Sequence, residues 1–390
     1  MKKYANVLKK NAMLIVLVLV FIFFTITTKG QMFQPMSFNA LISQNAYVFI
    51  LATGMLMCML TGGNIDLSCG SFVCFVGAIG GLLMGKDQLN LSPAVGIIVM
   101  LVVGIVYGCI LGYLIAYVDV PPWIATLAGY LAFRGWATAL LTKYTSTLSI
   151  PYPDSFIKIF SGKVFSTAAG TLNIPCMVVG IVAAVIVVVA NITGRAGKIK
   201  KGYEADSLVS VIVKSVIEVA AIILIAYKLA MAGGIPTVLI WVVAVVLIYS
   251  FITEKTSFGR YFYTIGGNAE ATRLSGVNTK KIMFIAYLNM AILTVITSFV
   301  VTSKLQAANS TSGTNFEMDA IAACVVGGVS AYGGSGKVFG MVNGATLIGV
   351  INLGMSFMNV DANWQKVVKG MIILFAVVFD IIANKKNATK

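Results

Sequence analysis

Long apolar runs recur along this chain, and they constrain its fold more than any other feature. Twelve runs can be drawn, at residues 12–28, 44–61, 66–84, 93–118, 122–142, 175–192, 208–229, 236–253, 282–302, 319–333, 337–358 and 364–383. Runs of about 18 or more apolar residues are typical of transmembrane helices. In lipid the backbone must satisfy its own polar groups, which favours helices. We therefore predict an all-α polytopic membrane protein with about 12 transmembrane helices, in one domain over residues 1–390.

The composition excludes an ordinary soluble domain. Hydrophobic residues make up 59% of the chain and charged residues only 11%, whereas soluble domains carry about 25% charge. The net charge of +15 would suggest a nucleic acid partner in a soluble protein. Here the cations lie in short loops between apolar runs, so we expect the lipid membrane as a partner and no nucleic acid.

The basic segments predict the topology. If the N-terminus is cytoplasmic, twelve crossings place four basic segments on that side: the start, 195–206, 254–281 and the tail. The opposite side then holds only scattered lysines, which is the positive-inside pattern. We therefore expect both termini in the cytoplasm. The short, Gly-rich run 319–333 resembles a re-entrant loop, but a return there would leave the basic tail outside. Both termini lie on the same side only if the number of crossings is even. This favours a crossing here, or a broken helix that reaches the inner face.

Two polar stretches inside the membrane are candidates for a transport pathway. In GGNIDLSCGS, residues 62–71, Asn64 or Asp66 can cap the next helix, and Asp66 can also mark a break beside the pathway. The second stretch, 305–345, is rich in small residues that allow close helix packing. Its polar side chains are expected to form the outer mouth of a pathway for a hydroxylated solute: Asn309, Thr311, Ser312, Asn315, Glu317 and Asp319, with Asn343 as a further candidate.

One cation is unexpected. Arg134 lies in the middle of the run 122–142. A charge at that depth is costly, so it should face a cavity or a carboxylate. The sequence alone does not identify its partner.

Several kinds of chemistry are excluded by the residues present. The chain has no histidine, which removes imidazole metal ligands and His general bases. The segment GGSGKV fails the phosphate-loop pattern because Ala331 and Val338 occupy two of its required positions. We therefore predict no catalytic residue, no metal, no cofactor and no ATP hydrolysis by this chain.

The polar stretch 254–281 is the strongest functional candidate. Gly266-Gly267 is expected to give a flexible lead, and Asn268 an N-cap. Glu270 and Arg273 match the helix dipole at the two ends of a short helix, while Gly276 fits the position after its C-terminus. Such a helix is too short to be stable alone, so it is expected to dock on a partner. The alternative is an amphipathic loop lying on the lipid surface.

Four motifs in this chain resemble those of a known family. FGRYFYTIGGNAEATRLSGV resembles the coupling-loop motif of the ribose/galactose/xylose class of ABC sugar permeases. GGNIDLSCGS, VPPWIATLAG and FEMDAIAACVVGGVSAYGGSGKV are similar to its other signatures, in the same order along the chain. The departures are small, at Asn64 and Cys69. The extra pair of spans around 195–206 and the ending FDIIANKK resemble the xylose/multiple-monosaccharide subgroup.

The resemblance implies a type II ABC importer-like permease of the bacterial inner membrane. Family members are membrane subunits, two copies of which form the pathway. An ATP-binding subunit, often a tandem double ATPase, drives them, and an extracytoplasmic sugar-binding lipoprotein delivers the sugar. By this resemblance 193–235 is a cytoplasmic loop plus an extra span, 254–281 is the coupling segment, and the coupling helix comprises Gly267, Asn268, Glu270, Ala271, Arg273, Leu274 and Gly276. Xylose is favoured, with galactose, glucose and arabinose open.

An ion-coupled secondary sugar transporter is the main alternative. Ion coupling needs a carboxylate-rich or titratable site in mid-membrane. Most of the candidate carboxylates fall near the ends of runs: Asp66, Glu218, Asp319 and Asp380. An intramembrane enzyme is a weaker alternative, because the chain has neither a Ser-His pair nor an HExxH motif.

Overall fold

Helices account for all twelve apolar runs. The computed structural model describes residues 12–145, 149–203 and 207–388. The helices are α2 (Ala12–Thr27), α3 (Pro35–Leu60), α4 (Cys69–Met84), α5 (Pro93–Ala116), α6 (Pro122–Tyr144), α8 (Ile174–Lys200), α9 (Leu208–Met231), α10 (Thr237–Lys255), α13 (Thr279–Leu305), α14 (Phe316–Val326), α15 (Val338–Phe357) and α16 (Ala362–Ala388). The predicted all-α class is confirmed.

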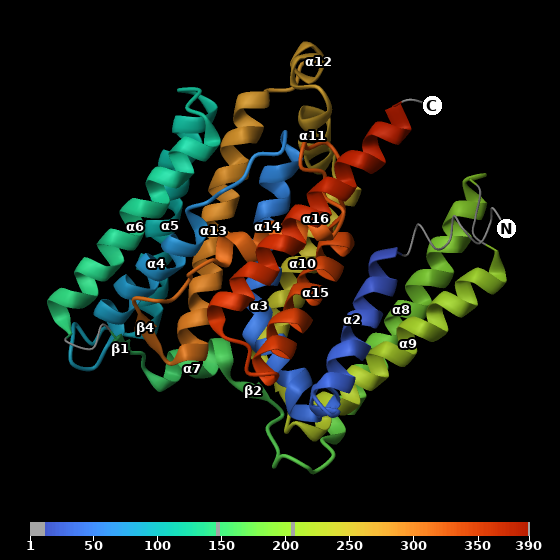
Figure 1. Ribbon diagram of the computed structural model, residues 1–390, viewed down its shortest axis with the longest axis horizontal. Helices are drawn as coiled ribbons and strands as arrows, with labels where there is room; N and C mark the ends of the chain where they lie inside the picture. The colour runs from blue at the N-terminus through green and yellow to red at the C-terminus, as the bar shows by residue number, and fades with distance from the viewer. Residues whose placement is uncertain (1–11, 146–148, 204–206, 389–390) are drawn as a thin grey trace.

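Short elements gather at the two ends of the helix bundle. The helices are η1 (Gln31–Phe33), α7 (Asp154–Ser161), α11 (Ser257–Gly267) and α12 (Ala269–Leu274). Two antiparallel strand pairs join β1 (Ser149–Pro151) to β4 (Ala307–Asn309), and β2 (Lys163–Val164) to β3 (Ile235–Pro236). Figure 1 shows α12 at the upper end of the bundle and β1, β4 and α7 toward the opposite end. We call these ends the α12 face and the β1–β4 face.

Not every helix is long enough to cross a membrane. Among the described residues, eight helices are long and apolar enough to do so: α3, α5, α6, α8, α9, α10, α13 and α15. Helix α14 has only 11 residues, or about 16 Å at the rise of an α-helix, against a hydrocarbon core of about 30 Å. It stops at Val326 because Gly327 and Gly328 follow, the latter with a φ of 82°.

The run 319–333 therefore forms a broken segment, a short helix followed by a loop. The chain leaves β4, continues without helix through 310–315, forms α14, and reaches the α12 face through the loop 327–337. There the amide of Gly334 donates to the carbonyl of Leu60, at the end of α3. Of the two possibilities left by the sequence, a broken helix is the one observed.

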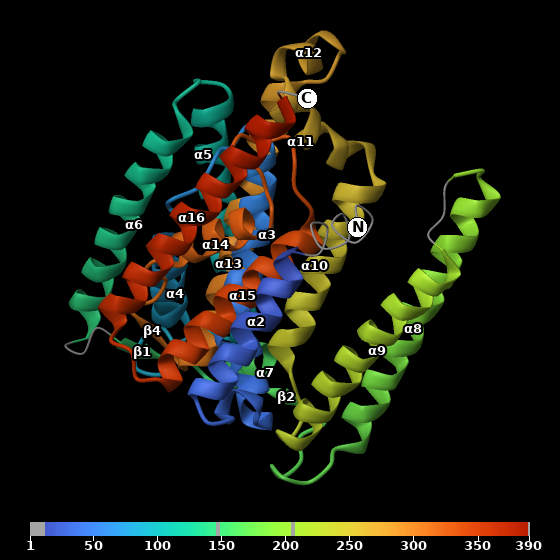
Figure 2. The ribbon, with the colours of Figure 1, turned by 45° about the vertical axis from the view of Figure 1, so that its right-hand side comes forward.

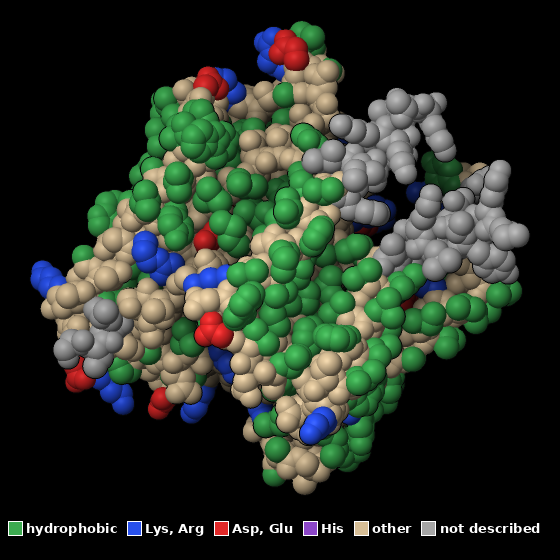
Figure 3. All heavy atoms as spheres, viewed as in Figure 1, with side chains coloured by type: hydrophobic (Ala, Val, Ile, Leu, Met, Phe, Trp, Pro, Cys, Tyr) green, Lys and Arg blue, Asp and Glu red, His purple; other side chains and the backbone are tan. Residues whose placement is uncertain are grey.

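The core surrounds α3 and α13. Within their most apolar stretches, 72% of the residues of α3 and 67% of those of α13 are buried, against 6% for α9. In Figure 2 the α8–α9 hairpin leans away from the other helices. Figure 3 shows charged side chains around α12 and along the opposite edge, with hydrophobic side chains over much of the surface between them. Buried carboxyl groups lie in and before two inner elements, at Asp66 before α4 and at Glu317 and Asp319 in α14.

Candidate functional site

Two broken segments cross inside the bundle. The first is 61–84, an extended stretch followed by α4, and the second is 310–337. Their backbones touch at two glycines: a Cβ at Gly313 would lie 1.9 Å from the carbonyl oxygen of Gly70. The φ of Gly313 is 72°, which also favours glycine. The contact brings the N-terminal ends of α4 and α14 together, and we call it the crossing.

Asp66 organises the start of α4. It is 1% exposed, and its Oδ1 accepts from the amide and the hydroxyl of Ser68 at 2.8 and 2.5 Å. The Tyr107 hydroxyl donates to Ser68 Oγ at 2.7 Å. Asn64 instead donates to the carbonyl of Thr61 at 3.1 Å. The N-cap residue of α4 is Ser68, and of the two candidates Asp66 bonds to that residue while Asn64 does not.

Arg134 has partners that the sequence did not reveal. Its Nη1 donates to the carbonyl of Ser310 at 3.0 Å and to that of Ser312 at 2.8 Å. Both carbonyls belong to the part of the second broken segment that has no helical structure. Sequence reasoning expected a cavity or a carboxylate. The hydrogen-bond acceptors are backbone groups, and the Glu317 carboxyl group lies within electrostatic range of the guanidinium.

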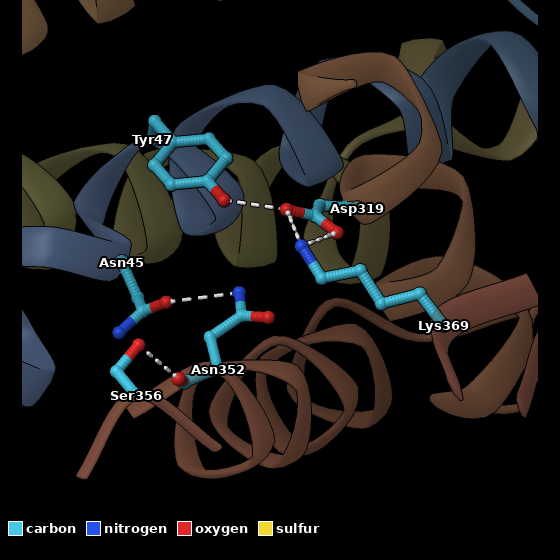
Figure 4. Close-up of polar contacts among 6 residues, drawn as sticks. All are labelled: Asn45, Tyr47, Asp319, Asn352, Ser356 and Lys369. Carbon is cyan, nitrogen blue, oxygen red and sulfur yellow. Dashed lines mark hydrogen bonds and ion pairs between the residues drawn. The ribbon is translucent and has the colours of Figure 1, made fainter. Parts of the chain in front are cut away.

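A buried ion pair lies on the other side of α14. Asp319 accepts from the Tyr47 hydroxyl at 2.5 Å and from Lys369 Nζ at 2.9 Å, and the side chains of Asp319 and Lys369 are 3% and 18% exposed. Figure 4 shows both donors converging on this carboxylate. Tyr47 also stacks on Phe316, with the ring centroids 3.7 Å apart. Sequence reasoning missed Lys369 and Tyr47, although a lysine within the last apolar run was a signal.

A second polar contact lies beside this ion pair. Asn352 of α15 donates to Asn45 Oδ1 of α3 at 3.4 Å, and the Ser356 hydroxyl donates to the Asn352 carbonyl at 2.8 Å (Figure 4). Together with Asp319 and Lys369, these side chains link α3, α14, α15 and α16 by polar contacts in an otherwise apolar region.

Of the side chains expected at the outer mouth, Thr311 is exposed and the others are buried or half-buried. Ser312 is 6% exposed, and Glu317 and Asp319 are each 2% exposed. Asn309 lies in β4, and Asn315 precedes α14 with a φ of 63°. Asn343 is half-buried on α15. The structure thus brings Asp66, Glu317 and 310–315 to the crossing, while Asp319 faces α3 and α16. Within the described residues, no group of three metal-ligating side chains lies close enough to hold an ion.

The predicted docking segment forms two helices. Asn268 Oδ1 accepts from the Ala271 amide at 2.9 Å, as expected of an N-cap, and Gly276 has a φ of 87°. Arg273 pairs with Glu270 through Nη2 at 2.6 Å, and the hydrogen bond and charge of this guanidinium lower the pKa of Glu270. The predicted flexible lead is wrong: Gly266 and Gly267 are the last two residues of α11.

Three Gly-Gly pairs meet beneath this segment. A Cβ at Gly266 would lie 2.0 Å from the Leu60 carbonyl oxygen and 2.3 Å from the Gly334 amide nitrogen. A Cβ at Gly333 would lie 2.5 Å from the Cα of Gly62. The three pairs, 62–63, 266–267 and 333–334, form what we call the glycine junction. It places α11 in backbone contact with Leu60 at the end of α3 and with Gly334 of the second broken segment, which in turn touches the start of the first.

Each face also carries a pocket of about 460 Å³. On the α12 face the lining residues come from α11, the α12–α13 turn and α13: Phe258, Tyr261, Ser275, Gly276, Val277, Asn278, Lys281, Ile282 and Ile285. On the β1–β4 face the lining includes charged and polar side chains, among them Lys86, Asp87, Asp154 and Gln306. Both faces therefore offer concave surfaces to other molecules.

Comparison with known proteins places the chain in a family. The model of the family "branched-chain amino acid transport system / permease component" matches residues 37–377. The xylose transport system permease protein XylH of Haemophilus influenzae is 33% identical, over 96% of both chains. XylH of Escherichia coli is 31% identical over 96% of this chain and 92% of its own.

A more distant relative agrees with this placement. The ribose import permease protein RbsC of Escherichia coli is 30% identical, over 94% of this chain and 88% of its own. No solved structure gives a significant match. The family match and the near-complete coverage of these relatives agree with the helical architecture described above. The chain is a multi-pass membrane protein that belongs to the branched-chain amino acid transport system permease family.

Proposed function

We propose that this chain is the membrane subunit of an ATP-driven bacterial importer for monosaccharides. The observation that carries the proposal is the glycine junction, which links an exposed helix, α12, to both broken segments. A permease needs such a link if a separate ATP-binding subunit is to drive it. Xylose is the favoured sugar, because the relatives with 33% and 31% identity are named as xylose permeases. Galactose, glucose and arabinose stay open.

The α12 face has the features of a protein docking surface. Leu274 at the end of α12 is 76% exposed. Exposed apolar side chains beside a groove are typical of binding sites. The neighbouring groove is partly apolar, and Lys281 at its rim is exposed. A partner that fits would offer a pocket for Leu274, and an apolar side chain with a carboxylate nearby for the groove. We assign this surface to the ATP-binding subunit, a tandem double ATPase.

The junction suggests how docking is coupled to the pathway. Gly266 has no room to move toward Leu60 or Gly334 without displacing them. A rigid-body shift of α11 and α12 would therefore move one end of each broken segment. Their other ends meet at the crossing, where Arg134, Glu317 and Asp66 lie. Two states of this arrangement would expose the interior to opposite sides of the membrane in turn.

The β1–β4 face suits delivery of the substrate. Its pocket combines both signs of charge with polar groups, which suits a soluble protein partner better than lipid. We assign it to an extracytoplasmic sugar-binding lipoprotein. We also expect a homodimer, whose second copy completes the pathway between the subunits.

Uptake in proteoliposomes tests the proposal. The chain is reconstituted with an ATP-binding subunit and a sugar-binding lipoprotein from the same organism. We expect labelled xylose to accumulate only when ATP is supplied on the side of the ATP-binding chain. Uptake by this chain alone, driven by a proton or sodium gradient, would contradict the proposal and support a secondary transporter.

Cysteine labelling tests the orientation. Among the native cysteines, all of which are described, five are buried and Cys109 is partly buried, so a single exposed cysteine gives a clear signal. A Leu274→Cys variant is treated with a membrane-impermeant maleimide in intact cells and in inverted vesicles. We expect labelling only in inverted vesicles. Labelling in intact cells would place α12 outside and remove the docking role.

A further inference from the structure

At the crossing, two backbone carbonyls bind the positively charged side chain of Arg134. Arg134 lies near the middle of α6, and its Nη1 donates at 3.0 and 2.8 Å to the carbonyls of Ser310 and Ser312. Because these residues precede α14 and have no helical structure, their carbonyls need donors from elsewhere. In a membrane such carbonyls must be satisfied within the protein.

A buried carboxyl group lies at the same place. Glu317 is 2% exposed, and its Oε2 would lie 2.1 Å from a Cβ at Gly70. The Arg134 guanidinium lies within electrostatic range of this carboxyl group. Glu317 Oε2 and Arg134 Nη2 are both buried and without a hydrogen-bond partner among the described residues. The crossing therefore combines two carbonyl dipoles and a buried carboxyl group around one cation.

Carbonyls of unwound helices often bind a mobile ion in other membrane transporters. Here a side chain of the protein supplies the charge. We propose that Arg134 is a tethered cation: a positioning residue whose guanidinium holds 310–315 at the crossing in place of a bound ion. The crossing then keeps its geometry without sodium or another dissolved cation. This inference concerns the chain itself and does not depend on an ATPase.

A pair of nearly isosteric variants tests the role of the charge. Arg134→Lys and Arg134→Met have side chains of similar length, but only lysine is charged. We expect Arg134→Met to lower the melting temperature of the detergent-purified chain by about 5 °C, and Arg134→Lys to restore at least half of that loss. Lys143→Met, at the exposed end of the same helix, is the matched control and should change little. Equal melting temperatures for the Lys and Met variants would overturn the proposal.

Chemical rescue distinguishes charge from packing. Arg134→Ala leaves space beside the carbonyls, whereas Arg134→Met fills it. We expect millimolar guanidinium chloride to raise the melting temperature of Arg134→Ala but not that of Arg134→Met, with choline chloride as the salt control. If Arg134→Ala melts like the wild type, or is destabilised and no small cation restores it, the tethered-cation role is wrong. These measurements remain valid even if the importer proposal fails.

Discussion

Gly266 of α11 lies against the carbonyl of Leu60, the last residue of α3, so closely that only a hydrogen atom fits between them. A Cβ there would be 2.0 Å from the oxygen. The same glycine touches Gly334, whose amide donates to that carbonyl at 3.0 Å. One carbonyl thus joins the end of a core helix, the docking segment and the second broken segment.

Gly266→Ala should therefore disturb this junction. The added methyl overlaps backbone atoms, and overpacking of this kind costs about 1–3 kcal/mol. We expect a lower melting temperature and fewer sugars transported per ATP hydrolysed, measured in the proteoliposome assay. Gly267→Ala is the matched control, because a Cβ there meets nothing within 4 Å. Equal behaviour of the two variants would show that the junction does not transmit movement.

Removing only one partner of the Asp319–Lys369 ion pair should strongly destabilise the fold. Lys369→Met leaves a buried carboxylate without its cation, which destabilises by about 3–5 kcal/mol. The double variant Asp319→Leu with Lys369→Met should recover much of this loss, because it leaves no unpaired charge. Denaturant or thermal unfolding in detergent measures the free energy of each variant.

An exposed ion pair provides the control for that measurement. Lys280 and Asp119 are 3.0 Å apart, with side chains 49% and 73% exposed. Removing Lys280 should cost at most about 1 kcal/mol. A loss for Lys369→Met no larger than for Lys280→Met would contradict the idea that the buried pair fixes α14 to α16.

Leu274 should contribute strongly to docking of the ATP-binding subunit. Truncating an apolar side chain that becomes buried in an interface costs about 1–3 kcal/mol. Leu274→Ala should therefore weaken binding about tenfold, as measured by titrating the ATP-binding chain onto nanodiscs. Leu305→Ala, also exposed but next to β4, is the control. Unchanged affinity for Leu274→Ala would remove α12 from the interface.

Binding of the ATP-binding chain should persist at acidic pH, because the pKa of Glu270 is lowered. Arg273 lowers the pKa of Glu270 below its usual 4.5. A carboxylate with a lowered pKa stabilises the fold above its ordinary pKa, and this contribution is lost as the pH falls through the lowered value. Binding of the ATP-binding chain should therefore stay constant from neutral pH to 4.5 and weaken only below it.

The variant Glu270→Gln separates this effect from others. It should bind more weakly at neutral pH, and the difference from the wild type should disappear in acid. A constant ratio of the two affinities at every pH would show that the ion pair does not support docking.

The sequence was sufficient for the helices of the twelve apolar runs, because an apolar run of this length is stable in lipid as a helix. It also predicted the local caps at Asn268 and Gly276, where neighbouring residues alone determine the geometry. It did not predict where α14 ends, since the apolar run continues beyond Gly327 although the helix does not. Backbone conformation at the two glycines, rather than hydropathy, sets that limit.

The features of the site that the sequence did not predict depend on contacts between segments that are distant along the chain. Lys369 reaches Asp319 across 50 positions, and no local pattern indicates that pairing. The acceptors of Arg134 are carbonyls, which every residue has, so side-chain identity gives no signal. Gly266 differs from Gly267 only in its neighbours in the folded chain. A Cβ at Gly266 would meet Leu60 and Gly334, whereas one at Gly267 would meet nothing within 4 Å. Roles of this kind become visible only when the segments are placed together.

The strands β1 and β4 pair Ser149 with Asn309, so the connection after α6 is hydrogen-bonded to the strand that leads into the crossing. If the sugar-binding lipoprotein docks here as proposed, a displacement of β1 would pass to β4 through backbone hydrogen bonds. Delivery of the sugar and rearrangement at the crossing would then be coupled without a relay of side chains.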